Sequence, residues 1–207
     1  RGLGDVYKRQ VNGIAGSYAE RVPVIAITGA PTRAVESAGK YVHHSLGEGK
    51  FDDYRKMFEP ITTAQGYITP DNATTEIPRL IQEAINERRP VHIHLPIDVA
   101  MTEIDVTSTF QPKQSTEQDI SSYIKMIEDK LNAAKQPVII AGHEINSFGL
   151  HSELERFVNQ TNIPVSQLSL GKGAFNEENE HYLGIFDGSI AEENVKKILG
   201  DQISYAK

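Results

Sequence analysis

Short apolar runs rich in β-branched residues alternate with segments of helical period along most of the chain, and this alternation constrains the fold more than any other feature. The runs predicted to be strands are residues 22–27, 91–95, 137–141 and 163–168. The segments with helical character are residues 75–88, 120–131, 150–160 and 191–198. Strands separated by helices are typical of parallel sheets covered on both faces, so the sequence predicts an α/β fold.

Two local features bear on where the helices begin. Pro78 interrupts residues 75–88, and a proline is tolerated there only if it lies in the first turn of the helix. Ser115 and Gln118 have the spacing of a capping box, which predicts that another helix opens at this point. The apolar face expected of that helix consists of Ile120, Tyr123, Ile124, Ile127 and Leu131. Residues 99–116 are polar and aperiodic, which indicates a linker between two domains.

The composition narrows the class of protein. With 207 residues the chain has room for one large domain or parts of two. Its net charge, 21 − 28 = −7, argues against a nucleic-acid partner. Without cysteine, its chemistry uses neither a thiolate nor a disulfide. The sequence contains no apolar run long enough to span a membrane and no secretory signal, so we expect a cytoplasmic protein without a membrane partner.

The adjacent histidines His43 and His44 are the strongest candidate for a functional site. They lie in a glycine-flanked segment with neither helical nor strand period. Imidazole exchanges protons near neutrality, with an ordinary pKa of about 6.5. Two imidazolium charges side by side repel each other, so at least one ring is expected to be neutral near pH 7. Judged without further context, such a pair is more often a solvated loop feature.

The sequence around this pair resembles the pyruvate and indolepyruvate decarboxylases, the 2-keto-acid decarboxylase branch of the thiamine-diphosphate enzymes. Five segments carry the resemblance in the family's order: residues 12–20, 24–31, 43–47, 90–98 and 170–175. The segment 43–47, His-His-Ser-Leu-Gly, is similar to the paired-histidine motif that separates this branch from the acetolactate synthase-like carboligases.

The resemblance implies a fold in two parts. Residues 11–98 are similar to the C-terminal half of a pyrimidine-binding parallel-sheet domain, and residues 117–207 to the first part of a Rossmann-like central domain. Residues 99–116 link them. Residues 1–10 do not match the family, and we interpret them as foreign or mis-assembled sequence. The chain is therefore expected to be a fragment.

The resemblance also implies a chemistry. Thiamine diphosphate, held with Mg²⁺, supplies the carbanion that attacks a 2-oxo acid, and CO2 and an aldehyde leave. His43 and His44 correspond to the paired active-site histidines, which place the substrate carboxylate and transfer protons. The family's activating glutamate and its diphosphate and magnesium site lie outside the matched residues, and its active sites form between subunits of a dimer or tetramer. The chain alone is therefore expected to be inactive and to hold neither cofactor nor metal by itself.

Two further patterns favour structural roles. His92 and His94 point to one face of a predicted strand, as a metal pair requires, but no third ligand is evident and we expect scaffold residues. Gly171-Lys172-Gly173 lacks the spacing of a phosphate-binding loop, and the resemblance implies that it is a turn at the end of a strand.

Two alternatives to the decarboxylase stay open on the sequence. One is a fragment of an acetolactate synthase-like thiamine-diphosphate carboligase, which shares the scaffold. The other is a non-catalytic α/β module. Among decarboxylases, the substrate is indolepyruvate, pyruvate or a similar 2-oxo acid.

Overall fold

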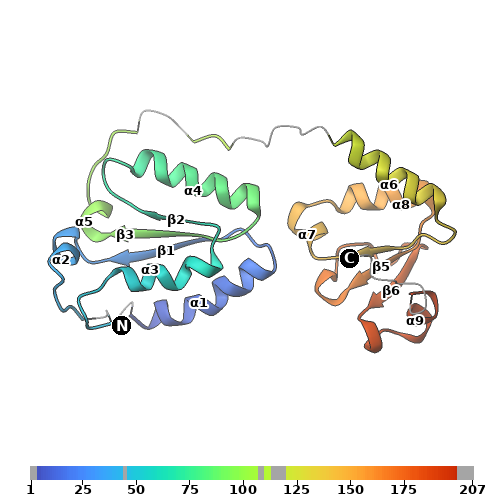
Figure 1. Cartoon of the computed structure of the whole chain (residues 1–207), viewed down its shortest axis with the longest axis horizontal. Coiled ribbons are helices and arrows are strands. Elements are labelled where there is room, and N and C mark those ends of the chain that lie inside the picture. The colour runs from blue at the N-terminus through green and yellow to red at the C-terminus, as the bar shows by residue number, and fades with distance from the viewer. Residues whose placement is uncertain (1–3, 44–45, 107–109, 113–119, 200–207) are drawn as a thin grey trace. The chain divides into compact units, whose positions relative to one another are not determined.

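The computed structural model describes residues 4–43, 46–106, 110–112 and 120–199, and it divides the chain into two compact units, Arg1–Ser115 and Thr116–Lys207. Each unit contains a three-stranded parallel sheet (Figure 1). The predicted α/β fold with two parallel sheets is therefore confirmed. Among the described residues, no helix combines the length and the apolarity that a membrane crossing requires.

The first unit is built around β3, which lies between β1 and β2. Its helices and strands are α1 (Gly4–Ala19), β1 (Ile25–Ala30), α2 (Arg33–Ser37), α3 (Asp52–Phe58), the 3-10 turn η1 (Glu59–Ile61), β2 (Ala64–Tyr67), α4 (Ala73–Glu87), β3 (Val91–Pro96) and α5 (Ile97–Ala100). The register places Thr28 of β1 and Tyr67 of β2 beside His94 of β3. Because the pairing is parallel, the carboxyl ends of β1 and β3 meet at one edge of the sheet.

The two faces of this sheet carry different residues. Val91 and Ile93 of β3 pack with Leu80 and Ala84 of α4 in the main apolar core. The opposite face lies toward α1 and α3 (Figure 1), and there Ala26 packs with Ile14 and Phe58. His92 and His94 alternate with the core residues of β3, so both histidines lie on this second face, as predicted.

The second unit repeats the βα alternation. It contains α6 (Ser121–Ala133), β4 (Ile139–Ala141), α7 (Glu144–Phe148), α8 (His151–Thr161), β5 (Val165–Leu168), the 3-10 turn η2 (Ser169–Gly171), β6 (Tyr182–Phe186), the 3-10 turn η3 (Gly188–Ile190) and α9 (Glu193–Leu199). Val158 of α8 packs with Val165 of β5 in one cluster, and Val195 and Leu199 of α9 pack with Phe186 in another. The sheet is thus covered by helices on separate sides (Figure 1).

Three strands begin later than the sequence predicts, and proline explains each case. The predicted strands 22–27, 137–141 and 163–168 are observed as β1, β4 and β5, which start at Ile25, Ile139 and Val165. Each start lies just beyond a proline, namely Pro23, Pro137 and Pro164. Proline has no N–H to donate to the ladder, so regular pairing begins only after it.

Pro78 is also placed differently from the prediction. α4 begins at Ala73, two residues before the predicted start, so Pro78 lies in the second turn of the helix and not in the first. It therefore removes one intrahelical hydrogen bond. The helix is retained because its apolar face, which includes Leu80 and Ala84, is buried against the sheet.

Two predictions at other helices have mixed outcomes. α6 forms where expected, but no residue of its apolar face is buried. The Ser115–Gln118 capping box lies outside the described residues. At the N-terminus, α1 runs from Gly4 through the segment that we interpret as foreign. The foreign origin of residues 1–10 and the domain limits 11–98, 99–116 and 117–207 stay predictions.

Candidate functional site

His43 lies in the loop 39–49, which is closed at its base by two glycines. Gly39 and Gly49 have φ values of +60° and +67°, and a Cβ added to Gly49 would collide with the Gly39 carbonyl. Only glycine permits this approach in the left-handed conformation. The loop therefore holds His43 near the end of β1, whereas His44 lies outside the described residues.

A pocket of about 510 Å³ opens at the carboxyl ends of β1 and β3, and His43 is part of its wall. Its other walls are mostly apolar, with few polar groups among them. The lining residues are Thr28, Gly29, Ala30, Pro31, Glu36, Val42, His43, Phe51, Tyr54, His94, Leu95, Ile97 and Ala100. A concave apolar site with a few convergent polar groups, at the carboxyl ends of parallel strands, has the features of a small-molecule site.

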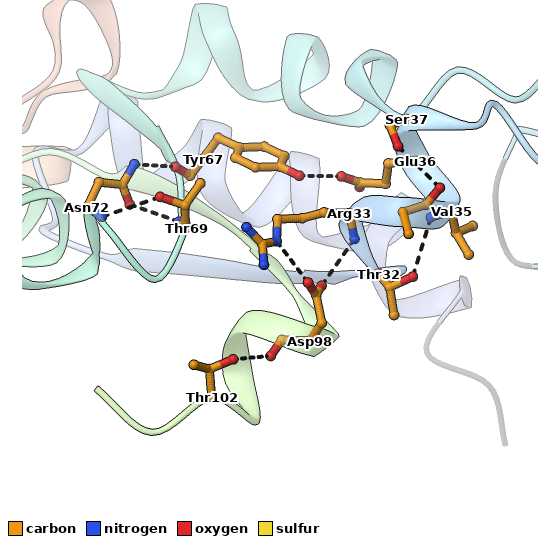
Figure 2. Close-up of polar contacts among 11 residues, drawn as sticks. Thr32, Arg33, Val35, Glu36, Ser37, Tyr67, Thr69, Asn72, Asp98 and Thr102 are labelled. Carbon is orange, nitrogen blue, oxygen red and sulfur yellow. Dashed lines mark hydrogen bonds and ion pairs between the residues drawn. The ribbon is translucent and has the colours of Figure 1, made fainter. Parts of the chain in front are cut away.

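Three polar side chains from different elements meet beside this pocket: Glu36 and His94 are part of its wall, and Tyr67 lines an adjoining pocket with them. The Glu36 carboxylate accepts a hydrogen bond from His94 Nε2 at 2.9 Å and another from the Tyr67 hydroxyl at 2.6 Å; Figure 2 shows the second bond. The rings of Tyr67 and His94 stack with centroids 5.0 Å apart. Burial, and then the neighbouring Glu36 carboxylate, raise the pKa of Tyr67, so its hydroxyl remains a donor.

Glu36 is held in place by the anchoring of the short helix α2. Thr32 caps this helix through its hydroxyl, which accepts from the Val35 N–H at 3.3 Å. Arg33 donates to Asp98 twice, from its backbone N–H at 3.1 Å and from Nε at 2.8 Å (Figure 2). The hydrogen bond from Arg33 lowers the pKa of Asp98, which therefore stays ionised.

Tyr67 is fixed from its backbone. The Asn72 side chain donates to the Tyr67 carbonyl at 3.0 Å and accepts from the Thr69 N–H at 2.8 Å. Figure 2 shows this clasp at the end of β2. The aromatic ring is therefore presented to Glu36 by a strand whose exit is locally constrained.

His92 has a different environment although it lies two residues before His94. It is fully buried, stacks on Phe58 with centroids 4.3 Å apart, and shares a 2.9 Å hydrogen bond with Thr28 Oγ1. Burial lowers the pKa of His92 to about 4, so the ring is neutral near pH 7. Its expected structural role is supported by this packing. In the described part of the chain, no group of three or more His, Cys, Asp or Glu side chains is placed to hold a metal.

The sequence predicts a structural role for His94, but the structure also places this residue at the pocket. Only 7% of its side chain is exposed, as expected of scaffold, yet it forms part of the pocket wall beside Glu36. Glu36 and Tyr67 are absent from the sequence-based site because α2 and β2 are too short for periodicity to reveal them. The available signal was the position of Glu36 just after the Ala30-Pro31 turn.

The Gly171-Lys172-Gly173 segment forms a turn after β5, as predicted. Gly171 ends η2, and a Cβ at this position would lie 2.7 Å from the Ala141 carbonyl oxygen. The glycine is required by close packing against the end of β4. Lys172 is exposed.

Comparison with known proteins gives this geometry a context. Residues 124–202 match the family model described as thiamine pyrophosphate enzyme, central domain. The chain is 32% identical over 191 residues to an α-keto-acid decarboxylase of Mycobacterium leprae. The matched region covers 91% of this chain and 33% of that protein. It is 30% identical over 199 residues to pyruvate decarboxylase isozyme 2 of Saccharomyces cerevisiae, covering 91% of this chain and 35% of that protein.

The chain thus spans about a third of the length of the curated relatives it matches. The similarity extends over nearly all of this chain, including the first unit with its pocket, and the family model independently matches the second unit. The second unit is therefore similar to the central domain of the thiamine pyrophosphate enzymes, and the chain is similar over 91% of its length to keto-acid decarboxylases.

Proposed function

We propose that the protein carrying this chain is a homo-oligomeric, cytoplasmic, thiamine diphosphate-dependent decarboxylase that converts a 2-oxo acid to an aldehyde and CO2. The observation that carries the proposal is the position of His43 in the wall of an apolar pocket at the carboxyl ends of β1 and β3. The similarity to keto-acid decarboxylases over 91% of the chain supports it. Because the chain spans about a third of those relatives, we assign activity to an enzyme of their length and expect the chain alone to be inactive.

The pocket favours a 2-oxo acid with a bulky apolar or aromatic side chain. Its apolar walls include Phe51, Leu95 and Ile97, and its volume of about 510 Å³ is far larger than pyruvate requires. Indolepyruvate or a similar acid is therefore preferred over pyruvate in this proposal. The smaller substrate would leave much of the apolar surface in contact with water.

In this proposal the residues of the chain itself bind the substrate and transfer protons. Imidazole at His43, and at His44 by its place in the predicted motif, serves to orient the substrate carboxylate and to give or take a proton. The pocket can accept a flat ring, but its lining includes no Lys or Arg to bind a diphosphate. Together with the lack of a metal-binding cluster among the described residues, this means that the diphosphate and Mg²⁺ do not fit this pocket.

The test is the product formed by the full-length enzyme from a panel of 2-oxo acids, with thiamine diphosphate and Mg²⁺ supplied. The proposal expects CO2 and the matching aldehyde, with higher kcat/KM for indolepyruvate or phenylpyruvate than for pyruvate. His43→Ala and His44→Ala are each expected to lower kcat by about 100-fold or more, the usual contribution of a proton-transferring group.

Two outcomes would contradict the proposal. Condensation of two 2-oxo acids without aldehyde release would favour the carboligase alternative. Wild-type turnover in both histidine variants would show that His43 and His44 are ordinary loop residues without a role in catalysis. Lys50→Ala, directly after the same loop, is a matched control, because Lys50 is exposed and does not line the pocket.

A further inference from the structure

Glu36 gives the wall of the His43 pocket a fixed polarity. Among the described residues that line this pocket, Glu36 is the only carboxylate, and none is Lys or Arg. Its Oε1 accepts a hydrogen bond from His94, and its Oε2 accepts one from Tyr67; Figure 2 shows the second bond. These two bonds account for the place of the carboxylate in the fold. They also determine what it can offer to a ligand.

The surroundings of Glu36 present acceptor positions to a ligand. A carboxylate has about four acceptor positions on its two oxygens, so each oxygen keeps one position after His94 and Tyr67 have bound. The Tyr67 hydroxyl and the His94 Nε2–H are donors, but both hydrogens are used in the bonds to Glu36. With 10% of the Glu36 side chain exposed, a ligand in the pocket meets a carboxylate whose neighbouring donors are occupied.

The nearest cationic side chains do not balance a further negative charge in this pocket. Arg33 and Arg55 line the adjoining pocket together with Glu36, and each already forms an ion pair with an aspartate. Neither arginine lines the His43 pocket. A second carboxylate placed beside Glu36 would therefore lie without a partner against mostly apolar walls, where burial of an unpaired charge is costly.

We propose that Glu36 is a specificity-determining residue, which selects a 2-oxo acid whose side chain ends in a hydrogen-bond donor and rejects one whose side chain ends in a second carboxylate. The inference rests on the proposed function, in which His43 receives the carboxylate of the 2-oxo acid. Glu36 repels that carboxylate, so the side chain is the part of the substrate that faces Glu36. An N–H or O–H group there gains an acceptor, whereas a second carboxylate meets acceptors and a like charge.

The kinetic test uses two substrates of the same shape, para-carbamoylphenylpyruvate and para-carboxyphenylpyruvate. They differ only in an amide against a carboxylate at the far end of the side chain. In the full-length wild type, kcat/KM is expected to be about tenfold to a hundredfold higher for the carbamoyl substrate, the range of a hydrogen bond to a charged group. Equal use of the two substrates, or a preference for the carboxy substrate, would overturn the inference.

Variants of the full-length enzyme assign this preference to Glu36. Glu36→Gln is expected to lower the ratio of the two kcat/KM values about tenfold, because glutamine removes the like charge and supplies an N–H donor to the carboxylate. Glu87→Gln, the same substitution at an exposed residue of α4, should keep the wild-type ratio. Tyr67→Phe should also keep it, because this change disturbs the wall but leaves the charge of Glu36. A wild-type ratio in Glu36→Gln would refute the assignment.

A binding measurement on the 207-residue chain is independent of turnover and of any variant. The probes are para-carbamoylhydrocinnamate and para-carboxyhydrocinnamate, which keep one carboxylate for His43 but lack the keto group that decarboxylation needs. ¹H–¹⁵N NMR titrations follow the backbone amides of Leu95 and Ile97 in the pocket wall. The carbamoyl compound is expected to bind with a Kd about tenfold lower. Equal affinities, or tighter binding of the carboxy compound, would contradict the inference.

The two measurements distinguish the failure of each proposal. If the full-length wild type releases no CO2 from any 2-oxo acid, the proposed function fails, and the inference about its substrates fails with it. If CO2 is released but the carbamoyl and carboxy substrates are used equally well, the proposed function stands and only the role of Glu36 fails. Release of CO2 together with both expected preferences, in kcat/KM and in Kd, supports the two proposals at once.

Discussion

The two histidines of β3 occupy the same face of one strand, yet the two ends of that face serve different purposes. We call the surroundings of His92, with Phe58 and Thr28, the core end, and those of His94, with Glu36 and Tyr67, the pocket end. At the core end an aromatic ring and a hydroxyl bury a neutral imidazole. At the pocket end a carboxylate faces the imidazole beside a cavity. The comparison shows that two buried histidines on one face of a strand have different surroundings because their partner side chains differ.

The largest expected effect is loss of the aromatic ring at the core end. Phe58→Ala removes a side chain that is 1% exposed and stacked on His92, and should lower the free energy of unfolding by about 3–5 kcal/mol. Urea denaturation followed by circular dichroism measures this. Phe51→Ala, in the wall of the pocket, is the comparison and should cost less because Phe51 is only partly buried. Equal costs at both positions would erase the distinction between the two ends.

The next effect concerns acid stability at the core end. Because the pKa of His92 is lowered to about 4 in the folded state, the unfolded chain binds this proton more readily below about pH 6.5. Stability from this group is complete above about pH 6.5 and is lost as the pH falls toward 4. From pH 7 to pH 5 the loss attributable to His92 should be about 2 kcal/mol.

His92→Gln isolates this contribution because glutamine does not titrate and retains a polar group near Thr28. Urea midpoints of wild type and variant should converge as the pH is lowered from 7 to 5. Parallel pH profiles for the two proteins would show that His92 is not buried in its neutral form.

A smaller effect is expected at the pocket end. Tyr67→Phe removes the hydroxyl that donates to Glu36 at 2.6 Å and should lower the free energy of unfolding by about 1 kcal/mol. The value is at the low end for a bond to a carboxylate because Tyr67 is 37% exposed. Thermal denaturation of the two proteins side by side provides the measurement. A loss as large as that of Phe58→Ala would make the pocket end part of the structural core.

The smallest effect is expected for Asp98→Asn. The ion pair between Arg33 and Asp98 is partly exposed, at 43% and 31% of the two side chains, so water and salt screen it. Its loss should leave the unfolding midpoint nearly unchanged, and the remaining difference should shrink when salt is added. A salt-independent loss of stability would indicate that the pair does more than orient α2.

Periodicity predicts the parts of the fold that are long and repetitive. It locates α4, β3 and α8 to within about two residues, and it places His92 and His94 on one face. The positions at which β1, β4 and β5 begin could also have been predicted from the sequence. Pro23, Pro137 and Pro164 have no N–H to donate to a strand ladder, so regular pairing is expected only after them.

The site was only half predictable for a physical reason. His43 stands out as a residue type in a glycine-flanked loop, whereas Glu36 becomes notable only through contacts. It lies 58 residues from His94 and 31 from Tyr67 along the chain. No local pattern encodes such pairings, because they arise from the parallel register of β2 and β3 and from the way α2 is tied to Asp98.

One measurement tests the contrast between the pocket and the core end most directly. It compares kcat for 2-oxo acid decarboxylation by the full-length enzyme carrying His43→Ala, a change in the pocket wall, with kcat of the enzyme carrying His92→Gln, a change at the core end. Both are assayed near pH 7 at a temperature where both are folded. The account predicts that His43→Ala lowers kcat by about 100-fold or more, whereas His92→Gln retains turnover close to wild type. Equal losses, or turnover retained by His43→Ala and lost by His92→Gln, would contradict the assignment of the pocket as the functional site.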